Sequence, residues 1–113
     1  MAVTQIESPA TLSHLLETEP ALAIWFTSPD CGLCKALTPR IERMVEAFPR
    51  LRLARVDVAQ AQEVAGQWQV MTVPALLIFF EGREHIRAAR HLDLAQIEAD
   101  IRRGYGLLFD ETP

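Results

Sequence analysis

Two runs of apolar residues limit the possible folds of this chain more than any other feature. Residues 21–26 (ALAIWF) and 75–80 (ALLIFF) are continuously apolar, which is typical of central strands covered on both faces. The alternating segment 51–58 predicts a third strong strand, and the segments between these runs place apolar residues at helical spacing. The predicted order is β-α-β-α-β-α-β-β-α. We therefore expect an α/β domain with a central mixed sheet of four to five strands and helices on both faces.

Turn and cap residues predict the limits of several elements. Ser8 followed by Pro9 is typical of an N-cap and a first helical residue, so a helix should begin there. Residues 59–68 predict a further short helix. The sequence Glu-Gly-Arg at 81–83 predicts a tight turn, after which residues 84–90 would pair antiparallel with the preceding strand.

The last helix is predicted from its capping residues. Asp93 with Gln96 three residues later resembles a capping box, which would begin the helix. Gly104 would stop it, because glycine is common just beyond a helix C-terminus. Residues 1–104 would then form the domain. Residues 105–113 would form a C-terminal tail that docks on the domain or on a partner.

Charge and hydropathy exclude several classes of function. The 113 residues carry a formal net charge of −4 with acids and bases interleaved, so we expect no partnership with nucleic acid or an anionic membrane. The longest apolar runs reach six and eight residues, whereas a membrane-spanning helix needs about 20. The first residues show no signal-peptide pattern, so the predicted location is the cytoplasm.

The two cysteines of the chain, Cys31 and Cys34, lie between a buried strand and a helix. Two intervening residues, Gly32 and Leu33, bring both sulfurs onto the first helical turn, close enough to form a disulfide. Cys31 would sit where free N–H groups and the positive helix end favour a thiolate, the attacking species in disulfide exchange. Cys34 would be more shielded and placed to resolve the mixed disulfide. Lys35 adds positive charge nearby.

The cysteine pair is also compatible with a role outside redox chemistry. Two cysteines can fall close together simply as small buried apolar residues. A structural zinc site needs two more ligands, and the available His14, His85 and His91 are not at zinc-site spacing. An iron–sulfur cluster bridging two chains has no positive support in the sequence. The prediction is a redox pair without a metal.

Over residues 1–104 the sequence resembles the thioredoxin superfamily. Five matches carry the resemblance: AIWFTSPDCGLCK at 23–35, Pro39, Arg55-Val56-Asp57, Val73-Pro74 and Gly82. The resemblance implies a thioredoxin fold in which a cis Pro74 faces the cysteines. It also implies that the backbone of Thr72 and Val73 is left free to pair with an incoming peptide as an added strand.

Several positions depart from the family pattern. Trp25 stands where thioredoxins carry a buried acid that moves protons during resolution, and Leu33 replaces a proline between the cysteines. Thr27 and Asp30 stand where tryptophans are common, and Arg90 replaces a glycine that borders the substrate groove. Asp30 opposes thiolate formation at the neighbouring Cys31. Because such changes shift reduction potentials in this family, we do not expect a general thioredoxin.

The resemblance implies a cytoplasmic thiol–disulfide oxidoreductase that reduces protein disulfides and needs no bound cofactor. Its partners would be disulfide-containing client proteins and an electron donor, either a thioredoxin-reductase-like enzyme or a small thiol. The alternative is a thioredoxin-fold adaptor or assembly factor whose cysteines are not its main activity. The missing acid at Trp25, the charge of Arg90 and the apolar residues 105–109 motivate that alternative.

Overall fold

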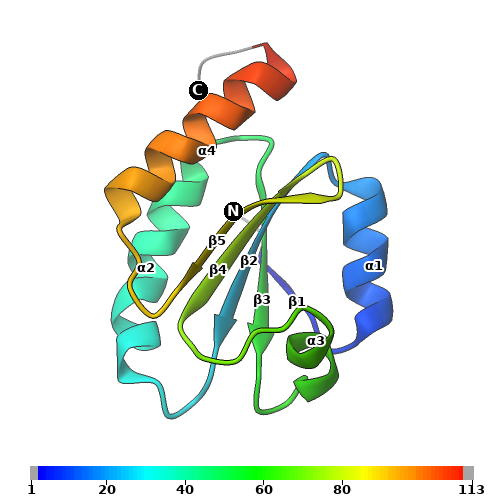
Figure 1. Cartoon of the computed structure of the whole chain (residues 1–113), viewed down its shortest axis with the longest axis vertical. Helices are drawn as coiled ribbons and strands as arrows, with labels where there is room; N and C mark the ends of the chain where they lie inside the picture. The colour runs from blue at the N-terminus through cyan, green and yellow to red at the C-terminus, as the bar shows by residue number, and fades with distance from the viewer. Residues whose placement is uncertain (1–2, 111–113) are drawn as a thin grey trace.

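The computed structural model describes residues 3–110 and confirms the predicted order of elements (Figure 1). In chain order these are β1 (Val3–Gln5), α1 (Pro9–Thr18), β2 (Ala21–Thr27), α2 (Gly32–Glu46), β3 (Arg52–Asp57), α3 (Gln62–Gln67), β4 (Ala75–Phe80), β5 (Arg83–Ala89) and α4 (Leu94–Phe109).

The five strands form one mixed sheet in the order β1-β3-β2-β4-β5, as the α/β prediction requires. Strand β2 lies at the centre, parallel to β3 and antiparallel to β4. The parallel register sets Thr27, the last residue of β2, beside Asp57, the last residue of β3. The carboxyl ends of these two strands and the start of β4 therefore meet at one end of the sheet, the lower end in Figure 1.

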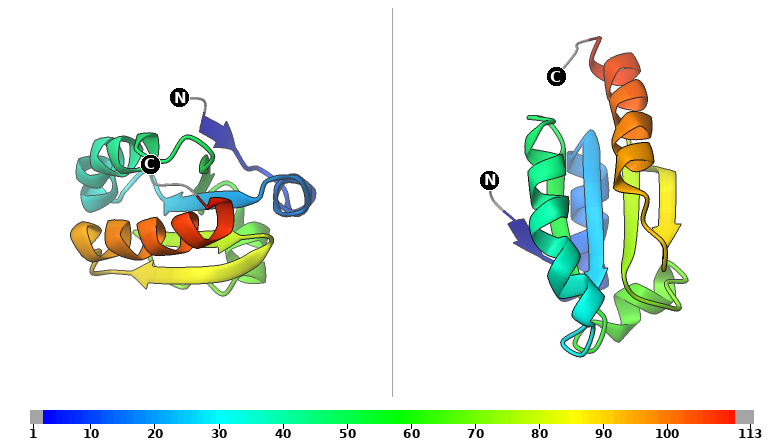
Figure 2. Two further views of the ribbon diagram at one scale, coloured as in Figure 1. Left: turned by 90° about the horizontal axis from the view of Figure 1, so that it is seen from above. Right: turned by 90° about the vertical axis from the view of Figure 1, so that its left-hand side faces the viewer.

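Helices cover both faces of the sheet, which explains why β2 is continuously apolar from Ala21 to Phe26. Alternate residues of a strand point to opposite faces. Ala21, Ala23 and Trp25 pack in the core under α2 and α4, whereas Leu22, Ile24 and Phe26 pack in the core under α1 and α3. Figure 2 shows α2 and α4 side by side in front of the sheet.

The predicted caps and the predicted hairpin are confirmed. Ser8 precedes α1 and its hydroxyl accepts the N–H of Thr11 at 3.3 Å, and Asp93 caps α4 by accepting the N–H of Gln96 at 3.1 Å. Glu81 and Gly82 form the two-residue turn between β4 and β5 with φ of 52° and 78°. Two positive φ angles are typical of the turn that matches the twist of a hairpin.

The predicted helix stop at Gly104 is wrong. Helix α4 continues to Phe109 and ends at Asp110, which has a φ of 52°. A Cβ on residue 104 would lie 2.5 Å from Cε2 of Phe80 and 3.0 Å from Nε2 of His85. Glycine is therefore required here by the close approach of α4 to the β4–β5 hairpin, a reason that has nothing to do with ending a helix.

The start of the predicted tail belongs to the domain. Residues 105–109 form the last turns of α4, and Tyr105 is fully buried, with its hydroxyl accepting the backbone N–H of Arg50 at 3.0 Å. Its ring also packs against Phe48 and Phe109, with centroids 5.3 and 4.6 Å away. Residues 111–113 of the predicted tail lie outside the described residues.

Candidate functional site

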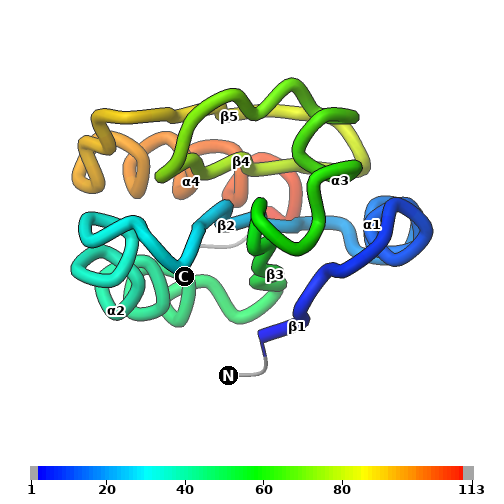
Figure 3. The backbone as a smooth tube through the Cα atoms, turned by 90° about the horizontal axis from the view of Figure 1, so that it is seen from below, coloured from blue at the N-terminus to red at the C-terminus, as the bar shows by residue number. Residues whose placement is uncertain are grey.

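The cysteine pair lies at the start of α2, at the end of the sheet where β2 and β3 terminate (Figure 3). Cys31 is the N-cap residue, and its sulfur accepts the backbone N–H of Cys34 at 3.1 Å. The two residues are joined by a disulfide, with Cα atoms 5.2 Å apart. Cys34 is 1% exposed, whereas Cys31 is partly exposed. An attacking group from outside therefore reaches the sulfur of Cys31 first.

The local electrostatics favour negative charge on the sulfur of Cys31. The first turn of α2 contains no acidic residue, so the N–H groups and the positive end of the helix are not already neutralised. Lys35 lies one turn into the helix, and its exposed side chain adds a positive charge near the pair. Asp30 is exposed on the preceding turn and opposes this effect.

The segment before β4 carries a free stretch of backbone. The peptide bond between Val73 and Pro74 is cis, and Val73 packs against the same apolar core as Cys31. Within residues 3–110, the backbone N–H and C=O groups of Thr72 and Val73 form no hydrogen bond. A peptide in extended conformation can pair with such free backbone groups as an added strand.

Arg90 lies directly beside this segment. Its backbone N–H donates to the carbonyl of Pro74 at 3.1 Å, and its φ of 67° lies in the left-handed region that favours glycine. The side chain is exposed and forms no ion pair with another described residue. The chain thus keeps a glycine-like backbone at this position but adds an unneutralised guanidinium.

Arg87 holds the loop that leads to Val73. Its guanidinium donates to the carbonyls of Trp68 and Gln69 at 2.8 and 3.4 Å and pairs with Glu84 at 2.8 Å. The hydrogen bond from Arg87 lowers the pKa of Glu84 and, in return, raises the pKa of Arg87. These hydrogen bonds tie β5 to Trp68 and Gln69, at the start of the loop that leads to Val73.

A cavity of about 260 Å³ that is partly lined by charged residues lies behind the cysteines. Its lining includes Cys34 and Lys35 from α2, Arg55 and Asp57 from β3, and Thr27 from β2. Arg55 and Asp57 are absent from the predicted site, where they served only as part of a family motif. The signal that could have found them is the parallel pairing of β2 with β3, which places the end of β3 beside the segment that leads to the cysteines.

Trp25 is buried in the same core cluster as Cys34. It is 1% exposed, and its indole N–H donates to the hydroxyl of Thr38 at 3.0 Å. That hydroxyl donates in turn to the carbonyl of Cys34 at 2.7 Å. The chain of hydrogen bonds anchors the first turn of α2, but an indole carries no group that titrates near neutral pH.

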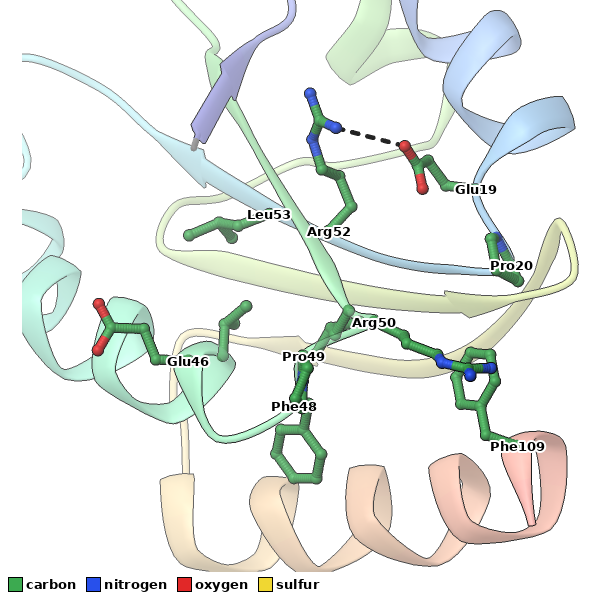
Figure 4. Close-up of a pocket in the computed structure, with 11 residues that line it drawn as sticks. Glu19, Pro20, Glu46, Phe48, Pro49, Arg50, Arg52, Leu53 and Phe109 are labelled. Carbon is green, nitrogen blue, oxygen red and sulfur yellow. Dashed lines mark hydrogen bonds and ion pairs between the residues drawn. The ribbon is translucent and has the colours of Figure 1, made fainter. Parts of the chain in front are cut away.

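A larger cavity of about 660 Å³ lies at the opposite end of β2 and β3 (Figure 4). Among its charged side chains, Arg52 pairs with Glu19 at 3.4 Å, and the guanidinium of Arg50 lies 4.9 Å from the ring centre of Phe109. No cysteine lines this cavity. It is therefore separate from the redox pair.

The cysteine pair is not joined by further metal-binding side chains in the described structure. Within residues 3–110, no group of three or more histidine, cysteine or acidic side chains is arranged to hold a metal ion. In the same part of the chain, no helix combines the length and the apolar character needed to cross a bilayer.

Comparison with known proteins decides the family. The family model described as Thioredoxin matches residues 3–103. The chain belongs to the thioredoxin family. Thioredoxin-like protein YdfQ of Bacillus subtilis is 30% identical over 105 residues, 93% of this chain and 94% of that protein. Thioredoxin 1 of Chlorobaculum tepidum is 31% identical over 98 residues, 85% of this chain and 97% of that protein.

Solved structures agree with this assignment. The X-ray structure of Fasciola hepatica thioredoxin matches with a TM-score of 0.78 at 25% identity, covering 88% of this chain and 97% of that chain. Family membership together with the Cys31–Cys34 pair supports thiol–disulfide oxidoreductase chemistry at the level of the family. Within the thioredoxin family this chain is a divergent member, with Trp25 in the core cluster that contains Cys34, and Arg90 hydrogen-bonded through its backbone to Pro74.

Proposed function

We propose that this protein reduces disulfide bonds in client proteins. The observation that carries the proposal is the position of Cys31: a partly exposed sulfur at the tip of α2, in the same core cluster as Val73, whose backbone is free to bind a peptide. The client would lie against Thr72, Val73 and Pro74 as an added strand, with Arg90 at the edge of the groove.

The reaction runs through a mixed disulfide. The thiolate of Cys31 attacks one client sulfur, and the other client sulfur leaves as a thiolate and takes up a proton. Cys34 then loses its proton and attacks the sulfur of Cys31, which releases the second client thiol. The client gains two electrons and the Cys31–Cys34 pair becomes a disulfide.

The oxidised pair must be reduced again for turnover. We propose that a thioredoxin-reductase-like enzyme or a small thiol supplies the two electrons, so no bound cofactor is required. The exposed Leu33 and Met71, which are 51% and 87% accessible, offer apolar contacts on either side of the site for such protein partners. The cytoplasmic location stays a prediction from the sequence.

The reductase activity is tested by the turnover of a protein disulfide such as insulin with a chemical dithiol as the final donor. We expect the wild-type protein to accelerate the reduction, and the Cys31→Ser variant to have no effect above the dithiol alone. The helix position predicts that the Cys31 thiol in a Cys34→Ser variant is alkylated at lower pH than a free cysteine, whose pKa is about 8.5. Absence of both effects would refute the proposal.

The second candidate is an adaptor that uses the fold to bind one partner. It is favoured by Leu107, which is 83% exposed on α4. A Cys34→Ser variant that captures many clients as mixed disulfides supports the reductase. One partner that remains bound when both cysteines are replaced by serine supports the adaptor.

A further inference from the structure

Cys34 is buried from bulk solvent but lines the cavity behind the active-site turn. The cavity measures about 260 Å³, and its lining is drawn from β1, β2, α2 and β3 together with the loop that follows β2. A water molecule occupies roughly 30 Å³ of liquid and needs polar partners. The cavity is therefore large enough for water molecules that link Cys34 to the polar residues of its lining.

The resolving step requires a proton acceptor near Cys34. Only the thiolate attacks a disulfide, so Cys34 must lose its proton when it attacks the sulfur of Cys31. Trp25, buried in the same core cluster as Cys34, has no group that accepts a proton at neutral pH. Any acceptor must therefore come from another element that reaches the cavity.

Asp57 is the only acid among the described residues that line this cavity. The other charged lining groups are the cationic side chains of Lys35 and Arg55, which carry hydrogen-bond donors and no acceptor, so neither can take up the proton. The elements β1 and β2 contribute the neutral side chains of Gln5 and Thr27. Asp57 thus combines the required charge with access to the cavity that Cys34 borders.

The backbone holds Asp57 in place for this role. It is the last residue of β3, paired in register with Thr27 of β2. Oδ1 of Asp57 accepts the N–H of Ala59 at 2.9 Å, and its carbonyl accepts the N–H groups of Gln60 and Ala61 at 3.1 and 2.8 Å. This turn also explains why α3 begins at Gln62 rather than at the predicted residue 59. The second carboxylate oxygen has no donor among the described residues.

We propose that Asp57 accepts the proton of Cys34 through water in this cavity during the resolving step. The inference rests on the proposed disulfide reduction. The Cys34 proton passes through water to Asp57 while the new bond forms between Cys34 and Cys31 and the bond between Cys31 and the client breaks. Asp57 then returns the proton to solvent, and the released client thiolate is protonated. When the Cys31–Cys34 disulfide is later reduced, Asp57 takes up a proton from solvent and delivers it to Cys34 by the same route.

The test compares three variants in a single turnover. Asp57→Asn removes the proton acceptor but keeps an oxygen for the Ala59 N–H, so the turn is retained. Asp57→Glu keeps the carboxylate. Glu42→Gln is the matched control, because Glu42 lines a neighbouring cavity of about 170 Å³ with Trp25 and Arg55, a cavity that Cys34 does not line. Far-ultraviolet circular dichroism verifies the fold of each variant.

The substrate is dithiobis-nitrobenzoate, whose two halves are released as coloured thiolates in sequence. The first release reports the attack by Cys31, and the second reports the attack by Cys34. We expect Asp57→Asn to slow the second release by about 100-fold near neutral pH, the lower end of the roughly 10²- to 10⁴-fold that a general base typically contributes. The first release should change little. Glu42→Gln should behave as wild type, and Asp57→Glu should restore much of the second rate.

The pH profile separates this role from a purely structural one. The slowing of the second release in Asp57→Asn, relative to wild type, should become smaller as the pH rises above about 8.5, where a free thiol ionises without a general base. Equal second rates in Asp57→Asn and Glu42→Gln, or a faster second rate, would overturn the inference, because removal of a mere negative charge favours the thiolate. A wild-type protein that releases no first equivalent would refute the proposed function itself, and the inference with it.

Discussion

Replacing Gly104 with alanine tests the packing of α4 directly. The new Cβ would lie 2.5 Å from Cε2 of Phe80 and 3.0 Å from Nε2 of His85. The Phe80 ring cannot swing aside freely, because it is half-buried and already packs on the His85 ring at a centroid distance of 4.9 Å. Either the ring moves or α4 is pushed away from the hairpin.

Two effects of opposite sign set the change in the free energy of unfolding caused by Gly104→Ala. Alanine in a helix interior is favoured over glycine by about 1 kcal/mol. Overpacking a filled site costs about 1–3 kcal/mol, and a contact this short at a ring edge belongs in the upper part of that range. We expect Gly104→Ala to lower the free energy of unfolding by about 1–2 kcal/mol.

Gly66 in α3 provides the matched control. It is exposed, and an added Cβ would meet no atom within 4 Å. Gly66→Ala should therefore raise the free energy of unfolding by about 0.5–1 kcal/mol through helix propensity alone.

Urea denaturation measures both changes as shifts of the midpoint at unchanged slope. A loss of about 1 kcal/mol corresponds to roughly 4–8 °C in Tm for a domain near this size. The double variant Gly104→Ala, Phe80→Leu should lose less stability than the two single changes predict, because the shorter side chain vacates the space that the methyl group needs. A Gly104→Ala protein as stable as Gly66→Ala would show that α4 is not held against the hairpin in this way.

Three further predictions concern Ser8 and Arg87. Ser8→Ala removes the hydroxyl that caps α1 and should lower the free energy of unfolding by about 1 kcal/mol in urea, whereas Ser8→Asp should retain most of it. Arg87→Met breaks the bridge from β5 to the carbonyls of Trp68 and Gln69, so we expect a higher KM for a protein disulfide with little change in the rate of alkylation of Cys31. Because the pKa of Glu84 lies below its ordinary 4.5, the contribution of the ion pair to stability is complete above that pH and is lost as the pH falls through the lowered value. This loss of stability is small because both side chains are partly exposed. When stability is measured as a function of acid pH, the Arg87→Met variant should not show this loss.

Features that depend on neighbours in the sequence could be predicted from the sequence. The apolar runs of β2 and β4, the cap at Ser8 and the turn at Glu81 and Gly82 each depend on residues only a few positions apart. The same holds for the cysteine pair, because two intervening residues and a following helix are enough to place both sulfurs on one turn. These local preferences all agree with the fold, which is why the order of elements and the fold class followed from the chain alone.

Tertiary structure decided what depends on contacts between distant segments. Glycine near a helix end can mark the end of the helix or make room for a neighbouring side chain, and the local sequence does not distinguish these two reasons. Only the contact with the ring of Phe80 shows why residue 104 is glycine. Asp57 reaches the cavity behind Cys34 because β3 lies parallel to β2, and Arg90 meets Pro74 because β5 returns beside β4. Strand pairing joins residues far apart in the chain, and no local propensity records which side chains the sheet brings together.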